Sequence, residues 1–115
     1  LPQQIEVSQE LVLRGQERFN IYCAPCHGYD GRGKGAVRER LLAKGFDWPI
    51  RDLVDPKGAV ITMPNGQLFN TISNGFGTMA GYAGQISVED RWAIVLYVRA
   101  LGRAFNASAE DGGPL

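Results

Sequence analysis

The chain has 115 residues, of which 44% are hydrophobic, and its twelve basic side chains balance twelve acidic ones. This length fits one small domain (residues 1–115), and a net charge of zero argues against nucleic acid, whose phosphates favour a clearly basic surface. The longest uninterrupted apolar run, residues 92–98, is far shorter than the roughly 20 residues that span a bilayer. We therefore expect one domain without a membrane span and without a nucleic-acid partner.

The first predicted helix covers residues 8–22. Ser8 is a suitable N-cap, and Glu10 lies near the positive end of the helix dipole. Apolar side chains recur along this segment at helical spacing, with a small gap at Gly15. A glycine inside a helix costs about 1 kcal/mol relative to alanine. We expect it to mark close contact with another helix, and simple tolerance is the alternative.

Both cysteines and the only histidine of the chain fall in one C-x-x-C-H string, at Cys23, Cys26 and His27. In a c-type haem attachment site, the two thiols bond to the haem vinyl groups and the histidine supplies one axial ligand of the iron. Two cysteines at this spacing reach both vinyl positions on one porphyrin edge. The string therefore predicts one covalently attached haem c at the end of the first helix.

Three other uses of the cysteines compete with haem attachment. A thioredoxin-like C-x-x-C opens a helix after a strand in an alternating β/α pattern, which this sequence lacks. A structural zinc site takes about four Cys and His ligands, more than this string supplies. A disulfide across so short a loop would constrain the unfolded chain little. Each alternative explains less of the string than haem attachment does.

Glycine-rich residues 28–35 follow the string. They are not expected to bind a nucleotide, because no strand precedes them and no G-K-[ST] follows at the right spacing. We expect a tight loop that lets backbone pass close to the haem. A short helix is predicted at residues 37–44, ended by Gly45. Residues 46–61 contain two X-Pro pairs and predict an irregular loop.

Two further helices complete the pattern. One starts after Asn65 and ends at Gly75, and the last runs over residues 88–101 behind a capping-box-like start. Residues 106–115 are small, polar and acidic, which predicts a flexible tail over residues 105–115 after a core of residues 8–104. No segment has a strand pattern. The predicted fold is all-α, with four to five short helices wrapped around one covalently bound haem.

These features together resemble a class I cytochrome c. Gly15 and Phe19 lie four apart on the first helix, the C-x-x-C-H string follows directly, and Ile94 and Tyr97 lie on the last helix. The similarity covers about residues 8–104. It implies the class I cytochrome c fold, with haem as the cofactor.

A narrower resemblance is to the small monohaem subunit of alternative complex III, a bacterial quinol-oxidising complex. It rests on residues 21–28, 74–79 and 88–95. It implies a donor in the quinol-oxidising complex and an acceptor that is a terminal oxidase or a soluble carrier. The c-type motif itself implies a periplasmic location, on the extracytoplasmic face of a bacterial membrane, because haem is normally attached outside the cytoplasm. The sequence begins at Leu1 without a charged and then apolar leader, so we expect that a secretory signal or an N-terminal anchor has been removed.

The family resemblance further implies a methionine as the sixth iron ligand, opposite His27. A thioether is a soft donor that raises the reduction potential, as in electron carriers. Met79 lies directly before the last helix, where class I cytochromes place this ligand, although Ala80 replaces the proline that often follows it. Met63, which precedes Pro64, is the alternative ligand and otherwise an adaptable haem-pocket contact.

Other side chains are candidates for contacts with the haem or its propionates. An indole N–H or a guanidinium binds a carboxylate well, while an ordinary core position or a solvated arginine is the alternative. The candidates are Trp48, Arg51, Arg40, Met63, Tyr82 and Phe76.

The predicted function is one-electron transfer between protein partners. Such a domain makes no bonds in a substrate, so we do not expect it to be an enzyme by itself. The alternative is a haem-based gas-binding or sensor domain with an open sixth site, which needs no methionine near the iron. A third hypothesis, thiol–disulfide exchange, requires Cys23 and Cys26 to be free thiols.

Overall fold

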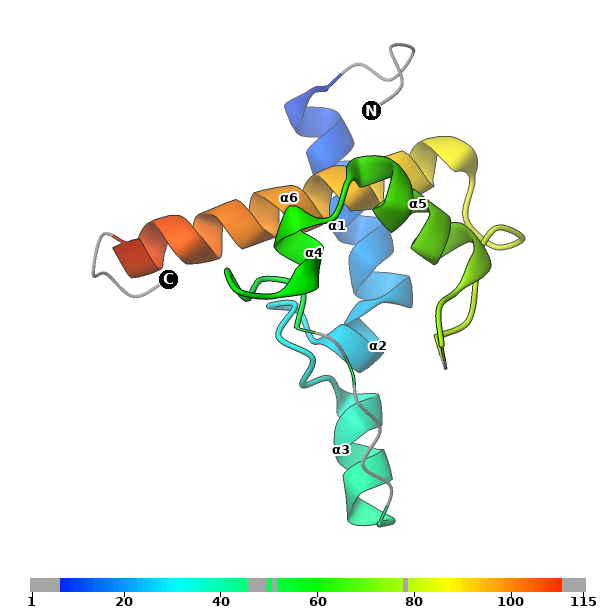
Figure 1. The fold of residues 1–115 in the computed structure, drawn as a ribbon. Coiled ribbons are helices and arrows are strands. Elements are labelled where there is room, and N and C mark those ends of the chain that lie inside the picture. The colour runs from blue at the N-terminus through cyan, green and yellow to red at the C-terminus, as the bar shows by residue number, and fades with distance from the viewer. Residues whose placement is uncertain (1–6, 46–49, 51, 78, 111–115) are drawn as a thin grey trace.

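The computed structural model describes residues 7–45, 50, 52–77 and 79–110, without the side chains of Arg38 and of residues 107–110. These residues form an all-α fold, as predicted, with only an isolated bridge between Phe76 and Met79 in place of a sheet. None of the helices described is long and apolar enough to cross a membrane. The helices are α1 Gln9–Tyr22, α2 Ala24–His27, α3 Ala36–Ala43, α4 Ala59–Thr62, α5 Asn65–Asn74 and α6 Val88–Glu110 (Figure 1).

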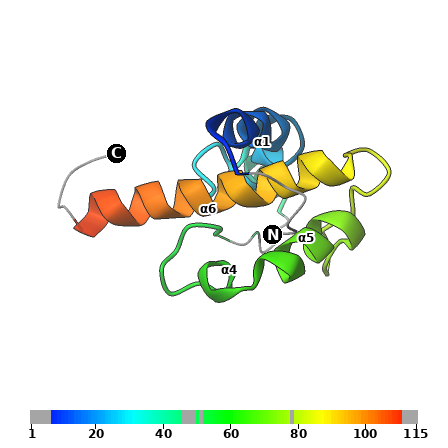
Figure 2. The same cartoon turned by 90° about the horizontal axis from the view of Figure 1, so that it is seen from above.

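Helix α6 is the centre of the fold. Figure 2 shows α1 crossing one side of α6, with α4 and α5 on the other side. At the crossing, a Cβ atom on Gly15 would lie 2.0 Å from the carbonyl oxygen of Ala93. One turn later, the ring of Phe19 is fully buried, 5.2 Å from the ring of Tyr97. The gap predicted at Gly15 is therefore a close helix contact.

The core lies around this crossing. It contains one of the two cysteines, Cys23, so part of the C-x-x-C-H string is also part of the hydrophobic interior. Tyr22, Met63 and Tyr82 are partly buried against it. The buried members are Phe19, Cys23, Ala24, Leu53, Val60, Leu68, Ile72, Ile86, Ile94, Val95 and Val98.

Three predicted helices match the structure closely. The Ser8 hydroxyl accepts a hydrogen bond from the Leu11 amide at 3.1 Å, as an N-cap does. Helix α3 is shifted by one residue from its predicted range. Helix α5 ends before Gly75, whose φ of 84° is in the left-handed region that favours glycine. Local signals were sufficient for these three elements.

The prediction of an irregular loop over residues 46–61 was wrong at its end, where α4 forms one helical turn. The guanidinium of Arg99 donates hydrogen bonds to the carbonyls of Val60 and Met63 and, at 2.8 Å, to the Asn65 side-chain oxygen. These acceptors lie at the C-terminal end of α4 and the start of α5. A distant side chain therefore stabilises a turn that has no local signal of its own.

The predicted end of the last helix at residue 101 was also wrong, because α6 continues to Glu110. The predicted tail is therefore helical as far as that residue, and residues 111–115 lie outside the described part of the chain. Gly102 does not end the helix. It is buried, and a Cβ there would lie 3.2 Å from the Ile61 side chain. The side-chain amide of Asn106, one turn further along the helix, donates a hydrogen bond to the Gly102 carbonyl at 2.9 Å.

An ion pair fastens α1 to the start of α6. Arg14 donates two hydrogen bonds to the carboxylate of Asp90, both at 3.0 Å. The Asp90 amide donates to the Ser87 hydroxyl at 3.1 Å, which is the N-cap half of the predicted capping box. Hydrogen bonding from Arg14 lowers the pKa of the Asp90 carboxyl below its usual value.

We expect the Arg14–Asp90 pair to make the stability of the fold depend on pH. Because the pKa of Asp90 is lowered in the folded state, its contribution is complete above the unfolded-state value of about 3.9 and is lost as the pH falls through the folded-state value. At neutral pH, Asp90→Asn should lower Tm by no more than about 5 °C, since exposed pairs are weak. Thermal unfolding of both proteins from about pH 7 to about pH 2 measures this. A Tm difference that does not shrink in acid would contradict the prediction.

Candidate haem site

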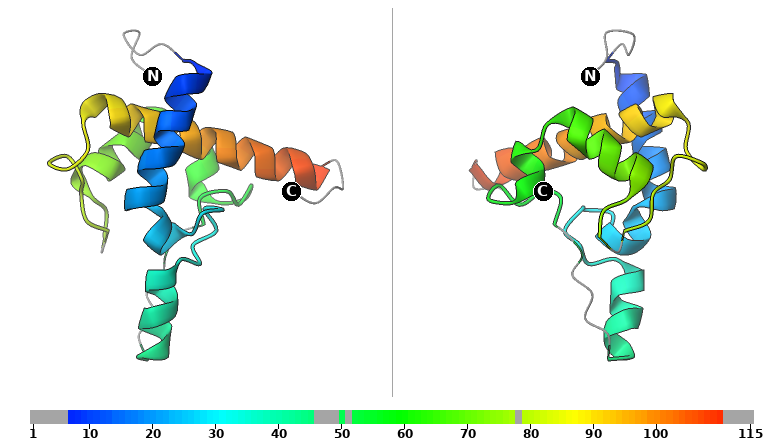
Figure 3. Two further views of the ribbon diagram at one scale, coloured as in Figure 1. Left: turned by 180° about the vertical axis from the view of Figure 1, so that it is seen from behind. Right: turned by 45° about the vertical axis from the view of Figure 1, so that its right-hand side comes forward.

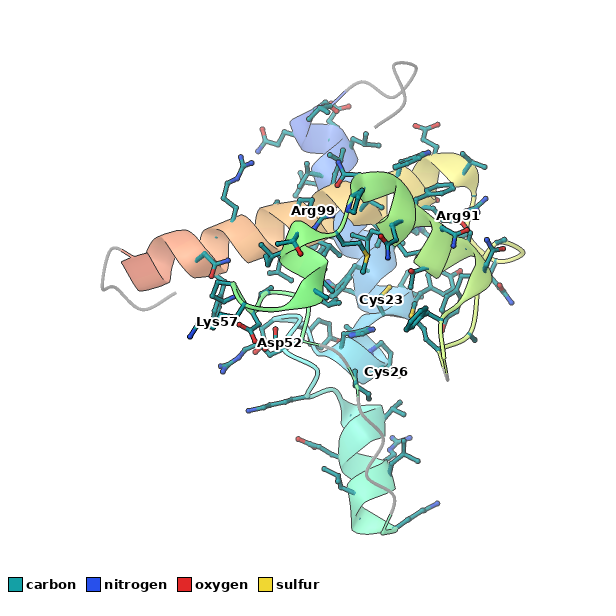
Figure 4. All side chains as sticks on the ribbon, viewed as in Figure 1. Cys23, Cys26, Asp52, Lys57, Arg91 and Arg99 are labelled. Atoms are coloured by element: carbon teal, nitrogen blue, oxygen red, sulfur yellow. The ribbon has the colours of Figure 1, made fainter. Side chains whose placement is uncertain are left out.

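The C-x-x-C-H string is folded as a helical turn that continues α1 after a break at Cys23. The Cys23 amide donates to the Phe19 carbonyl at 2.8 Å, closing α1, and the His27 amide donates to the Cys23 carbonyl at 2.9 Å, closing α2. Pro25 lies in the first turn of α2, where no backbone donor is needed. Figure 4 shows Cys23 and Cys26 at the junction of α1 and α2.

Backbone amides of the glycine-rich loop, residues 28–35, donate hydrogen bonds to this turn. The Gly33 amide donates to the His27 carbonyl at 2.7 Å, and the Gly35 amide donates to the Cys26 carbonyl at 3.0 Å. A Cβ on Gly35 would lie 2.3 Å from the Pro25 carbonyl oxygen, so no side chain fits there. The expected tight loop is confirmed, and in the described residues its close approach is to the backbone of the string itself. The loop thereby fixes the position of the His27 backbone.

The environment of the Cys23 thiol disfavours its reaction as a thiolate. Cys23 is 8% exposed and Cys26 is half-buried, and they are not joined to each other. Burial raises the pKa of the Cys23 thiol to about 12. Thiol–disulfide exchange needs a thiolate, which a lowered pKa favours and a raised pKa disfavours. A thioether has no charge and is compatible with this burial.

Met79 lies in a short hairpin that follows α5. The amides and carbonyls of Phe76 and Met79 pair with each other, at 3.2 and 2.9 Å. The returning chain is fixed to the end of α5, because the Tyr82 amide donates to the Ile72 carbonyl at 2.8 Å and the Ala83 amide donates to the Ser73 carbonyl at 3.1 Å. Figure 1 shows this hairpin extending below α5 towards the level of α2. Met79 is half-buried in it.

Tyr82 connects the Met79 hairpin to the C-x-x-C-H string. Its ring lies 5.7 Å from the ring of Tyr22, at the end of α1. Burial raises the pKa of the Tyr82 hydroxyl, and the nearby Cys23 and Cys26 thiols raise it further. The hairpin and the C-x-x-C-H string therefore border the same region of the structure.

Met63 is also half-buried and packs against the core. It follows α4, and its carbonyl accepts a hydrogen bond from Arg99 on α6. Burial does not distinguish the two methionines. The segments that carry them differ in their hydrogen bonds. The Met63 segment is bonded to Arg99 of α6, and the Met79 segment is bonded to the end of α5.

Of the remaining candidates for haem contacts, two lie outside the described residues and two are exposed. Trp48 and Arg51 lie outside the described residues. Arg40 is an exposed residue of α3, and Phe76 is 67% exposed at the Met79 hairpin. Figure 3 shows α3 extending away from the rest of the chain beyond α2. A helix of eight residues is marginal alone in water, so α3 depends on its packing against α2.

Sequence reasoning missed Arg91, one of the two polar side chains found buried among the described residues. Its signal was present in the helical spacing, because residue 91 precedes Ile94, Val95 and Val98 on the buried face of α6. A charged residue in an apolar stripe is informative, since burying a charge is costly unless it is hydrogen-bonded.

No cluster of His, Cys, Asp or Glu in the described part of the chain is arranged as a metal-ion site.

Comparisons with known proteins bear on the family and on the fold. A family model described as cytochrome C oxidase, cbb3-type, subunit III, matches residues 10–98. A comparison with curated proteins gives no match.

Two solved structures have a similar fold. One is a chain of the Kuenenia stuttgartiensis reducing HAO-like protein complex Kustc0457/Kustc0458, with a TM-score of 0.67 and 22% identity over 84% of this chain and 46% of that chain. The other is the KustC0563 c-type cytochrome, with a TM-score of 0.61 and 22% identity over 76% of this chain and 95% of that chain. This chain therefore spans less than half of the first relative and nearly the whole length of the second.

Proposed function

Because the chain belongs to the cytochrome c family matched by the cbb3-type subunit III model, we propose that it carries single electrons through a haem with His27 and Met79 as axial ligands. Membership of this family implies a covalently bound haem c and haem-based electron transfer, and it fits an electron carrier rather than an enzyme. In this proposal Cys23 and Cys26 form the two thioether bonds.

When bound, the haem supplies an iron that changes between the ferrous and ferric states. The chain's part is to hold both ligands in place, so that little rearrangement accompanies electron transfer. The Gly33 and Gly35 amides fix the backbone on the His27 side. Backbone hydrogen bonds from Tyr82 and Ala83 to the end of α5 fix the Met79 side. A thioether from Met79 would favour ferrous iron and raise the reduction potential.

One observation supports Met79 over Met63 most directly. The chain that leaves Met79 reaches Tyr82, whose ring lies 5.7 Å from the ring of Tyr22, the residue directly before Cys23. The Met63 carbonyl instead accepts a hydrogen bond from Arg99 of α6. A ligand on the Met79 hairpin therefore requires only that its side chain turn towards the region that Tyr82 already borders.

We further propose that the donor belongs to a quinol-oxidising complex and that the acceptor is a terminal oxidase or a soluble carrier. The support is the resemblance of residues 21–28, 74–79 and 88–95 to the small monohaem subunit of alternative complex III. One chain of similar fold belongs to a reducing HAO-like protein complex, so this fold also occurs within a multi-protein assembly. Family members of this kind act on the extracytoplasmic side of the membrane, which we propose for this chain too.

The ferric spectrum tests the ligand assignment. We expect a low-spin spectrum with a sulfur-to-iron charge-transfer band that Met79→Ala abolishes and Met63→Ala preserves, because only one thioether is bonded to the iron. The reduction potential of Met79→Ala should fall by on the order of 100 mV or more, while that of Met63→Ala changes much less. The reverse pattern would assign the ligand to Met63.

Two simpler measurements test the proposal as a whole. The mass of the protein under denaturing conditions should correspond to the chain with one haem attached, and two free thiols would reject a c-type cytochrome. Rapid carbon monoxide binding by the unmutated ferrous protein would indicate an open sixth site and favour a gas-binding sensor.

A further inference from the structure

Arg91 is a buried arginine that binds only uncharged groups among its recorded partners. It lies in the first turn of α6 and is 8% exposed. Its guanidinium donates to the Ser73 hydroxyl at 2.5 Å and to the Ser87 carbonyl at 3.4 Å, and it lies 4.9 Å from the centre of the Phe69 ring. A guanidinium stays charged in proteins, so burial without an acid requires these contacts to be well placed.

The two hydrogen-bond acceptors of Arg91 lie on the two sides of the Met79 loop. Ser73 is in the last turn of α5, just before the loop begins, and Ser87 is at its end, just before α6. The loop also returns to Ser73, whose carbonyl accepts from the Ala83 amide at 3.1 Å. A Cβ on Gly81 would lie 2.6 Å from that carbonyl oxygen, so the returning chain is in tight contact there.

Aromatic stacking keeps the guanidinium in place. The rings of Phe69 on α5 and Trp92 on α6 are stacked, with centroids 4.1 Å apart and an angle of 17°. Arg91 lies against the same Phe69 ring, and Figure 4 shows its side chain beside α5. The planar guanidinium is thus fixed by a ring as well as by two oxygen atoms, an arrangement that lysine cannot reproduce.

We propose that Arg91 is a positioning residue that keeps the Met79 loop closed, and thereby keeps the Met79 sulfur within reach of the iron. This inference rests on the proposed ligation by Met79. The guanidinium joins the start of the loop to its end, so opening the loop requires these hydrogen bonds to break. Loss of Arg91 should leave the haem attached and raise the population of molecules in which Met79 has moved away.

Arg99 provides a matched control on the same helix. It is also partly buried, and the acceptors recorded for it are uncharged groups of Val60, Met63 and Asn65. These acceptors belong to the α4–α5 segment and not to the Met79 loop. Arg99→Gln should therefore reduce stability without making the sixth iron position more accessible.

Imidazole binding to the ferric holoprotein measures loop opening. Imidazole can bond to the iron only when the methionine has left, so its apparent affinity rises in proportion to the open population. We expect Arg91→Gln to bind imidazole about ten- to hundredfold more tightly than the unmutated protein, because hydrogen bonds from a charged donor are lost. Ser73→Ala removes one acceptor only, and should tighten binding by a smaller factor. Arg99→Gln should stay within about twofold of the unmutated protein.

The variants separate positioning from general destabilisation and from charge. Equal tightening in Arg99→Gln and Arg91→Gln would overturn the proposal, as would unchanged affinity in both Arg91→Gln and Ser73→Ala. Arg91→Lys keeps the positive charge but lacks the planar guanidinium with its several N–H donors, so its imidazole affinity should resemble that of Arg91→Gln. An affinity in Arg91→Lys equal to that of the unmutated protein would also overturn the proposal. The ligand is tested separately: if Met79→Ala loses the sulfur-to-iron band while Arg91→Gln leaves imidazole affinity unchanged, the proposed function stands and the role of Arg91 fails.

Discussion

Replacing both cysteines in Cys23→Ser/Cys26→Ser should release the haem and destabilise much of the fold. The haem would lose its two covalent bonds, and α3, which packs mainly against α2, depends on the segment that carries both cysteines. A group that binds only the folded state stabilises it by several kcal/mol. We therefore expect Tm to fall by at least about 15 °C, or the cooperative transition to disappear. Far-UV circular dichroism during heating measures this change.

The single variant Cys26→Ser is the control for this experiment. It should keep one thioether through Cys23, so that mass measurement under denaturing conditions still finds one haem. The double variant should yield the mass of the bare chain. Haem that remained attached to the double variant under denaturing conditions would show that the attachment site lies elsewhere and would refute the assignment of both cysteines.

Gly15→Ala is expected to have the second large effect, on stability alone. The added Cβ would lie 2.0 Å from the Ala93 carbonyl oxygen and 2.5 Å from its carbon, both of which are backbone atoms. A flexible side chain could move aside, but here α1 and α6 would have to separate, which would weaken the packing of Phe19 on Tyr97. We expect the free energy of unfolding to fall by about 3 kcal/mol or more, measured by denaturant titration of the holoprotein.

Gly66→Ala is the matched control, because Gly66 is also a helical glycine but has open space around its Cβ position. There the alanine should stabilise the protein by about 0.5–1 kcal/mol, since it favours helix and restricts the unfolded chain. If both substitutions stabilised the protein, the close approach of α1 to α6 at Gly15 would be contradicted.

Much of the fold could be predicted because its signals are local. Ser8 caps α1 through a bond to a residue three positions away, and Gly75 ends α5 through its own backbone conformation. The α1–α6 contact at Gly15 and Ala93 is long-range, yet a glycine in an apolar helix face was enough to predict close contact with another helix, although not which one. In each case one residue type had a specific physical reason for its position.

The predictions failed where distant partners decide the structure. The α4 turn and the start of α5 depend on Arg99, which lies 39 residues from Val60 and 34 from Asn65. Gly102 looked like a helix end, but its lack of a side chain serves contact with Ile61, so the helix continues. A local pattern cannot distinguish a glycine that ends a helix from one that allows another chain segment to approach.

The sequence by itself predicted the haem chemistry, because two cysteines and a histidine at this spacing are typical of covalent haem attachment and are read without reference to the rest of the chain. It also determined the all-α fold, through caps and helical periodicity. Only the tertiary structure decided what surrounds the site: Tyr82 beside the two cysteines, and Arg91 on Ser73, 18 residues away. The physical reason is that a covalent motif is read from adjacent residues, whereas the acceptors of a buried guanidinium exist only after α5 and α6 have packed together.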